Sequence, residues 1–171
     1  MGGKKKGGKK VFRIQPTIWS ASRDGNIQDL TAILEGEVDI NELDNLGWAP
    51  LHYACLEGRR EAVVFLLDHG ADINKMTEGI QTEIGGFDKN YFEIQYIGVT
   101  PIHIAVRKGF NAIVSELIRR GADPTIYDLI GQTALQYANA KTRSILNFEM
   151  SADHPPEPPK EEGEEEETEE V

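Results

Sequence analysis

The chain has 171 residues, 39% of them hydrophobic, and a formal net charge of −11; it is long enough for one sizeable core, and its acidic balance excludes specific nucleic-acid recognition because phosphate affinity comes from Lys and Arg. A single cysteine, Cys55, excludes an internal disulfide and is typical of a reducing compartment. There is no apolar run long enough to span a bilayer and no signal-peptide core, so we expect the chain in the cytoplasm, with the nucleus as the alternative.

The first 15 residues form a basic head rich in glycine. They carry six Lys or Arg residues and no acid. Like charges spaced by glycine do not fold, so we expect a flexible arm. The alternative is that the head contacts an acidic polymer, an acidic tubulin tail or a membrane surface.

Two phrases recur in the middle of the chain. The first combines an apolar pair, a glycine and an aspartate, and it stands at residues 66–74, 117–125 and, in worn form, 33–41. The second, Ala-Pro-Leu-His-Tyr-Ala at 49–54, returns as Thr-Pro-Ile-His-Ile-Ala at 100–105. Asp39 and Asp72 are 33 residues apart. A period of 33 with this wording is typical of stacked helix-turn-helix units, which usually bind partners.

On these phrases the chain resembles the ankyrin-repeat family over residues 16–150. The resemblance implies an all-α repeat array, a solenoid of helix-turn-helix units with β-hairpin tips. We expect four units, at about residues 16–43, 44–77, 98–127 and 128–150. The first and last units depart from the family wording, as expected of units that cap the stack.

The second phrase predicts how each unit begins. In Thr-Pro-Ile-His at 100–103, Pro101 fits a first helical turn because its φ is already set, and Thr100 and His103 cap that turn. Gly109 then ends a short helix. A second helix follows, with an apolar stripe formed by Ile113, Val114, Leu117 and Ile118.

An insertion separates the second and third units. Gly47 and Gly98 are 51 rather than 33 residues apart, so 18 extra residues lie between these units. Across residues 78–97, apolar and polar residues alternate on both sides of a Gly-Gly-Phe-Asp-Lys-Asn stretch. The alternation predicts an extended hairpin growing from the ordinary finger of the unit. A mobile surface loop is the alternative, and the insertion either contacts a partner or covers the repeat surface.

The sequence predicts no catalytic, metal or cofactor site. His52 and His103 occupy the same slot of successive units, and neither has Cys, Asp or Glu at metal-ligand spacing. The repeat gives both a structural role at a helix start. Signatures of a nucleophile elbow, a phosphate loop or paired carboxylates are also missing, so we predict that the chain is not an enzyme.

The resemblance implies that partners bind a concave surface lined by the finger tips and the exposed side of the first helices. Carried over position by position, the partner-binding residues are Asn45, Leu46, Trp48, Leu56, Glu57, Tyr96, Ile97, Val99, Arg107, Lys108, Leu129, Ile130 and Gln132. Turn tips are normally polar, and clustered exposed apolar groups mark contact sites. Four tip residues are apolar here: Leu46, Trp48, Leu129 and Ile130. The competing interpretation is that the insertion folds over them.

Residues 151–171 form an acidic tail with ten Asp or Glu residues and one Lys. The tail lacks a core-forming pattern and is predicted to be disordered. We interpret Pro-Pro-Glu-Pro-Pro-Lys at 155–160 as a stiff spacer, with an extended ligand for a proline-binding groove as the alternative. The glutamate run is similar to a tubulin C-terminal tail. Together with the Gly/Lys-rich head, it suggests a ciliary or cytoskeletal setting.

The sequence therefore favours a non-catalytic adaptor or scaffold that holds a protein partner on its concave surface, within a ciliary, axonemal or cytoskeletal assembly. The alternative is a regulatory or targeting subunit of an enzyme such as a kinase or phosphatase. An assembly protein co-purifies with its partner in fixed stoichiometry, whereas a regulator changes an enzyme's rate.

Overall fold

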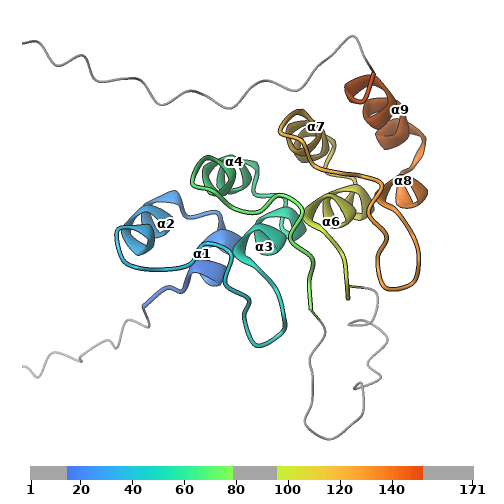
Figure 1. The fold of residues 1–171 in the computed structure, drawn as a ribbon. Coiled ribbons are helices and arrows are strands. Elements are labelled where there is room, and N and C mark those ends of the chain that lie inside the picture. Colours follow the sequence, from blue (N-terminus) through green and yellow to red (C-terminus); the bar gives the residue numbers. More distant parts are fainter. Residues whose placement is uncertain (1–14, 79–95, 152–171) are drawn as a thin grey trace, which may run out of the picture.

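The computed structural model describes residues 15–78 and 96–151. In these ranges eight helices form four pairs, which Figure 1 shows stacked side by side in chain order. The first helices of the pairs are α1 (Ile18–Asp24), α3 (Pro50–Leu56), α6 (Pro101–Lys108) and α8 (Ala134–Tyr137). The second helices are α2 (Ile27–Leu34), α4 (Arg60–Asp68), α7 (Asn111–Arg119) and α9 (Ala140–Glu149). The predicted all-α repeat array is confirmed; the predictions for the head, the inserted hairpin and the tail lie outside the described residues.

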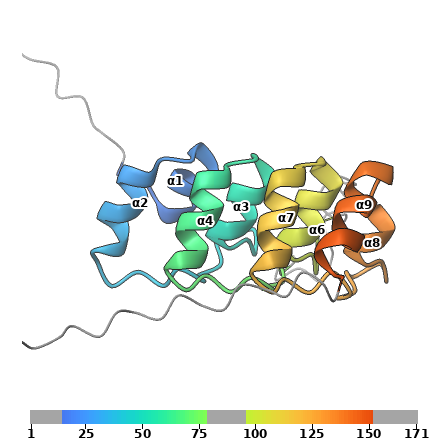
Figure 2. The same ribbon diagram turned by 90° about the horizontal axis from the view of Figure 1, so that it is seen from above.

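The helices form two layers, one of first helices and one of second helices (Figures 1 and 2). Fully buried side chains from both layers meet in one continuous core; the largest include Leu30, Leu51, Leu66, Ile102, Leu117 and Leu146. The predicted apolar stripe of α7 is buried in this core. The loops before α3 and α8 project from the first-helix layer, away from the second helices (Figure 1). We call these loops the fingers.

The two repeat histidines have the predicted structural role. Nδ1 of His52 accepts a hydrogen bond from the Ala49 N–H at 2.9 Å, and Nδ1 of His103 accepts one from the Thr100 N–H at 3.2 Å. The other ring nitrogen of each histidine then donates to a carbonyl oxygen, of Lys75 at 2.8 Å and of Gln132 at 3.3 Å. Each histidine therefore caps a helix and holds the loop that follows its helix pair.

The first unit divides the histidine's two tasks between two residues. Ser20 forms the capping box with Thr17, the residue that precedes α1. The indole N–H of Trp19 donates to the Glu42 carbonyl at 3.0 Å, as His52 does to Lys75 one unit later. Trp19 therefore replaces the loop-holding function of the histidine, which explains why this terminal unit tolerates a different wording.

Asparagine side chains join successive units. The Asn41 side-chain oxygen accepts from the Asp72 N–H at 2.7 Å, and the Asn74 side-chain oxygen accepts from the Asp123 N–H at 2.9 Å. Since each bond crosses from one unit to the next, the Asp-Ile-Asn ending of the first repeated phrase holds the loops at the ends of the second helices in register.

An ion cluster joins α4 to α7 in the second-helix layer. Glu116 is nearly buried, and its carboxylate accepts from Arg119 at 2.9 Å, Arg60 at 3.1 Å and Arg120 at 2.7 Å. Arg120 also binds Asp68 at 2.6 Å. Burial acts to raise the pKa of Glu116, but the three arginines outweigh it and lower the pKa. We call these five residues the outer clamp.

The last unit is more compact than the repeat pattern predicts. Its first helix, α8, has 4 residues, and Ala138 follows it in an extended conformation. Thr142, which stands where the repeat has a glycine, is buried inside α9 rather than in a turn. Without a glycine to end the first helix in the left-handed conformation, the chain turns early, and Asn139 caps α9 by accepting from the Thr142 N–H at 2.9 Å.

Candidate partner-binding surface

Two fingers have the same internal construction. In the first, Oδ1 of Asp44 accepts from the Leu46 N–H at 2.9 Å and the Trp48 N–H at 3.0 Å, and Gly47 turns the chain at φ +75°. In the second, Oδ1 of Asp128 makes the corresponding bonds, at 3.1 Å and 2.8 Å, and Gly131 has φ +76°. The predicted turns are therefore present. Because aspartate fixes the backbone, the tip side chains are free to vary.

A tyrosine ties each of these fingers to its first helix. The hydroxyl of Tyr53 donates to Oδ2 of Asp44 and that of Tyr137 donates to Oδ2 of Asp128, each at 2.6 Å. Burial and this bond raise the pKa of Tyr137 to about 12 and also raise that of Tyr53. Both phenols are thus protonated donors at neutral pH, and they fix the angle between finger and helix.

Five side chains form a continuous row along the fingers and first helices. The Trp48 ring lies 5.3 Å from the Tyr53 ring and 5.4 Å from the Tyr96 ring, between centroids. The Arg107 guanidinium lies 5.6 Å from the Tyr96 ring centroid and 3.9 Å from that of Tyr137. All five are half-buried, so each keeps an exposed edge. We call Trp48, Tyr53, Tyr96, Arg107 and Tyr137 the aromatic row; it spans the second, third and fourth units.

Beyond the row, the finger tips expose aliphatic side chains. Leu46, Leu129 and Ile130 are 46%, 59% and 56% exposed. Leu46 and Ile130 occupy equivalent positions, each directly before the glycine that turns its finger. The predicted exposure of these three tips is therefore present. Together with the aromatic row, they make an apolar strip across the concave surface, the surface between fingers and first helices.

Other predicted site residues lie deeper than expected. Asn45, Glu57 and Lys108 are exposed, whereas Leu56, Ile97, Arg107 and Gln132 are half-buried. Trp48 and Tyr96 pack against the core with much of their rings covered, so the prediction that Trp48 points away from the stack is wrong. Each still has surface available for contact.

Val99 is a wrong prediction, because its side chain is 0% exposed. It shares a repeat slot with Trp48 and Gln132, but the chain entering the insertion closes over it. The Thr77 N–H donates to the Val99 carbonyl at 2.9 Å, and the Val99 N–H donates to the Thr77 hydroxyl at 3.1 Å. These bonds pair the two described ends of the insertion, while the predicted hairpin itself lies outside the described residues.

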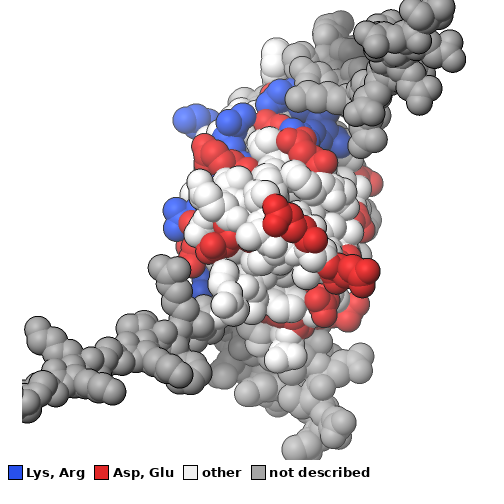
Figure 3. Space-filling view, turned by 90° about the vertical axis from the view of Figure 1, so that its left-hand side faces the viewer, with Lys and Arg blue, Asp and Glu red and all other residues white. Residues whose placement is uncertain are grey.

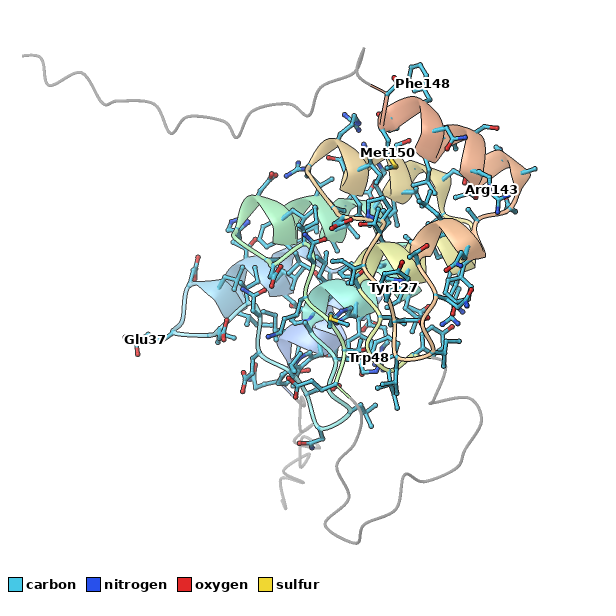
Figure 4. The ribbon with its side chains drawn as sticks, turned by 45° about the vertical axis from the view of Figure 1, so that its right-hand side comes forward. Glu37, Trp48, Tyr127, Arg143, Phe148 and Met150 are labelled. Atoms are coloured by element: carbon cyan, nitrogen blue, oxygen red, sulfur yellow. The ribbon has the colours of Figure 1, made fainter. Side chains whose placement is uncertain are left out.

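Sequence reasoning missed Tyr53 and Tyr137 as members of the surface. A signal was present: each tyrosine follows its finger aspartate, Asp44 or Asp128, by nine residues. Reading the tyrosines as part of the repeated helix phrase hid this spacing. The structure also exposes apolar groups that the sequence did not single out, at Tyr127, Phe148 and Met150; Figure 4 shows Phe148 and Met150 at the far end from Trp48.

Reactive chemistry is not supported by the described groups. Burial lowers the pKa of His52 to about 4, so its ring is neutral near pH 7, and both ring nitrogens are already bonded. Burial likewise raises the pKa of the Cys55 thiol, which keeps it protonated and unreactive. Among the described residues no cluster of His, Cys, Asp or Glu has the arrangement of a metal site. Across the same residues, no helix has the length and apolarity to cross a membrane.

Charge is distributed unevenly along the stack. The first unit, residues 16–43, carries six acids against a single arginine. Figure 3, which faces this end of the stack, shows acidic side chains spread across it. By contrast, α6 ends with Arg107 and Lys108, and α9 carries Lys141 and Arg143. The concave surface therefore runs from an acidic first unit to basic third and fourth units.

The comparisons with known proteins agree with the repeat architecture. A model of three consecutive ankyrin repeats matches residues 5–77, and a single ankyrin-repeat model matches residues 97–129. The chain belongs to the ankyrin-repeat family. The gap between the two matches contains the insertion.

Several large proteins carry similar ankyrin repeats. Human BCL-6 corepressor-like protein 1 is 32% identical over 104 residues, which are 61% of this chain and 5% of that protein. Human scaffold protein ILK is 41% identical over 66 residues, 38% of this chain and 15% of that protein. The E3 ubiquitin-protein ligase hecd-1 of Caenorhabditis elegans is 29% identical over 119 residues, 67% of this chain and 4% of that protein. The chain thus spans only a small part of each relative, and the ankyrin repeats support a protein-interaction module.

Proposed function

We propose that this chain is a non-catalytic scaffold that holds a protein partner on its concave surface. The observation that carries the proposal is the apolar strip, in which exposed Leu46, Leu129 and Ile130 flank the half-buried aromatic row. Exposed apolar groups gathered on one surface mark contact sites, and Trp, Tyr and Arg are frequent binding anchors.

The internal hydrogen bonds of the fingers support a preformed site. Asp44 and Asp128 hold the finger backbones and, through Tyr53 and Tyr137, the angle of each finger to its helix. A surface fixed in this way loses little conformational entropy when a partner binds. The chain's function is therefore proposed to be recognition, with the palmitoyltransferases and ubiquitin ligase among its relatives sharing ankyrin repeats rather than an activity.

The setting of this scaffold is proposed to be cytoplasmic, in a ciliary or cytoskeletal assembly. The proposal draws on the composition of the termini: a basic Gly/Lys head suited to contact with an acidic tubulin tail, and an acidic tail that itself resembles one. A tagged full-length chain imaged in its own cells tests this part; an even distribution away from cytoskeletal structures would overturn it.

Site-specific photo-cross-linking tests the binding surface. A photoreactive amino acid replaces Leu46 or Ile130 in the full chain, and Phe148 on α9 serves as an equally exposed control. We expect the two finger positions to capture the same partner in fixed stoichiometry and the control position to capture none of it. Capture from Phe148 alone would move the binding surface to the second-helix layer, and an enzyme whose rate changes on capture would favour the regulatory alternative.

A further inference from the structure

The aromatic row contributes one ring per unit, and this period restricts the ligand that can follow it. Trp48 belongs to the second unit, Tyr96 to the third and Tyr137 to the fourth. Neighbouring units are separated by the packing distance of helices, roughly 8–10 Å. A ligand that contacts each ring in turn therefore needs a side chain on one face about every 9 Å.

A polyproline II segment has this period. With three residues per turn and about 3.1 Å per residue, its positions i and i+3 lie on one face about 9 Å apart. A β-strand instead returns to one face about every 6.6 Å. An α-helix returns after seven residues, about 10.5 Å, but neither terminal segment of this chain has apolar residues at that spacing. Proline-rich segments also dock in aromatic-lined grooves because their conformation is set before binding.

The chain carries a segment with this spacing beyond its last helix. Pro155 and Pro158 are three residues apart, as are Pro156 and Pro159, and Glu157 stands between the two pairs. The aromatic row has the complementary order, since the Arg107 guanidinium lies between the rings of Tyr137 and Tyr96. Two apolar contacts and one charge on the segment thus meet two rings and one cation on the row.

We propose that residues 155–159 dock on the aromatic row of their own chain. The first proline pair contacts Tyr137, Glu157 faces Arg107 and Lys108, and the second proline pair contacts Tyr96 beside Trp48. The proposal rests on the concave surface being the binding surface of the scaffold. It makes the tail an intramolecular competitor of the partner, so the partner binds by displacing this segment.

The connection to the last helix is long enough for this arrangement. The helix α9 has 10 residues and follows the turn after Tyr137, so Ser151 lies about one helix length, roughly 15 Å, from that turn. Four residues from Ser151 to Pro155 span up to about 14 Å, and eight to Pro159 span up to about 28 Å. The segment then runs from the fourth unit toward the second.

Charge sets where docking ends. After Lys160 the tail has eight glutamates, and continued docking would carry them onto the acidic first unit. Like charges brought together there repel. The recognised part is therefore the short Pro-Pro-Glu-Pro-Pro segment, while the glutamate run points away from the stack.

The two tryptophans of the chain provide the test. Trp48 lies in the aromatic row and Trp19 donates its indole N–H to Glu42 in the first unit, so nuclear magnetic resonance of the two indole N–H groups compares the row with an internal reference. The full chain is compared with a full-length variant in which Pro155, Pro156, Pro158 and Pro159 are serine. We expect the Trp48 resonance to shift in the variant and the Trp19 resonance to stay. A synthetic peptide of residues 152–162, added to the variant, is expected to return Trp48 toward its original position.

Several outcomes would overturn the proposal. These are an unshifted Trp48 resonance, equal shifts of Trp48 and Trp19, and a shift that disappears when the unmodified chain is diluted, which would mean that a second copy supplies the segment. A control variant replaces Glu164, Glu165, Glu166 and Glu167 with glutamine; if it reproduces the proline effect, the tail is held by charge alone. Photo-cross-linking of the partner at Leu46 and Ile130 is independent of this shift, so it separates failure of tail docking from failure of the scaffold function.

Discussion

The outer clamp and the aromatic row both connect the second unit to the third, but they use their side chains differently. In the clamp, both carboxylate oxygens of Glu116 accept from arginines, and the side chain is only 9% exposed. In the row, Trp48, Tyr96 and Arg107 contact one another and keep exposed edges. A cluster whose polar groups are satisfied internally holds units together, whereas half-buried aromatic groups retain area for a ligand. The comparison assigns stability to one layer and recognition to the other.

Acid should separate the two regions most strongly. Because the pKa of His52 falls from 6.5 to about 4 on folding, the unfolded chain binds the proton first, and stability is lost as pH falls from 6.5 toward 4. The loss amounts to about 3 kcal/mol for this residue. The folded-state pKa of Glu116 is lowered, so the clamp keeps its contribution until the pH falls below the ordinary range of glutamate.

Urea unfolding of the full chain at pH 7 and pH 4.5 measures this loss, with His52→Gln as the matched variant. Glutamine is already used in this slot by the fourth unit, where Gln136 accepts from the Thr133 N–H at 2.7 Å. We expect the variant to depend less on pH than the parent chain. Identical pH dependence in both would show that His52 is not buried in its neutral form.

Breaking the clamp should cost stability without affecting recognition. Glu116→Ala leaves Arg60, Arg119 and Arg120 without their shared carboxylate, and we expect a loss of roughly 2–3 kcal/mol in the free energy of unfolding. Leu117→Ala, one residue away in the core, should cost a comparable or larger amount, about 2–5 kcal/mol, by opening a cavity. Partner affinity measured below the melting transition should be unchanged for both. A selective loss of affinity in Glu116→Ala would place recognition in the second-helix layer.

Truncating Trp48 should affect both properties. Trp48→Ser removes contacts with the rings of Tyr53 and Tyr96, so we expect a loss of about 1–2 kcal/mol in stability. Partner binding should weaken by roughly 2 kcal/mol, about thirtyfold. Trp48→Phe is the control that keeps a ring in place and should retain most of both. If Trp48→Ser melts the chain as severely as Leu117→Ala, the ring belongs to the core and not to the binding surface.

Two glycines distinguish finger packing from backbone strain. Gly47 and Gly121 both have positive φ, at +75° and +91°, so alanine at either position is strained by about 1 kcal/mol. A Cβ at Gly47 would also lie 2.0 Å from the Glu78 carbonyl oxygen, whereas nothing lies within 4 Å at Gly121. We therefore expect Gly47→Ala to lower the thermal midpoint further than Gly121→Ala. Equal shifts would show that this finger does not contact the start of the insertion.

The repeat wording predicted the helix pairs, their caps and the finger turns, because local chemistry determines them. Pro101, His103 and Gly109 have the predicted positions at the ends of one short helix. Burial within the fingers could not be predicted in the same way. Val99 shares a repeat slot with Trp48, yet its exposure depends on Thr77, which only the folded path of the chain brings beside it. Likewise, the contacts of Arg107 with two tyrosines come from three different units.

The central claim, that the finger side recognises the partner, is tested most directly by comparing two matched double variants of the full chain. One replaces Leu129 and Ile130 with serine, and the other replaces Phe148 and Met150, which are about equally exposed on and after α9. Partner capture at equal bait is measured with the thermal midpoint of each variant. We predict that the finger variant loses at least about tenfold in affinity, roughly 1.4 kcal/mol, with an unchanged midpoint, and that the α9 variant captures normally. Equal capture by both, or loss only in the α9 variant, would contradict the assignment of recognition to the fingers.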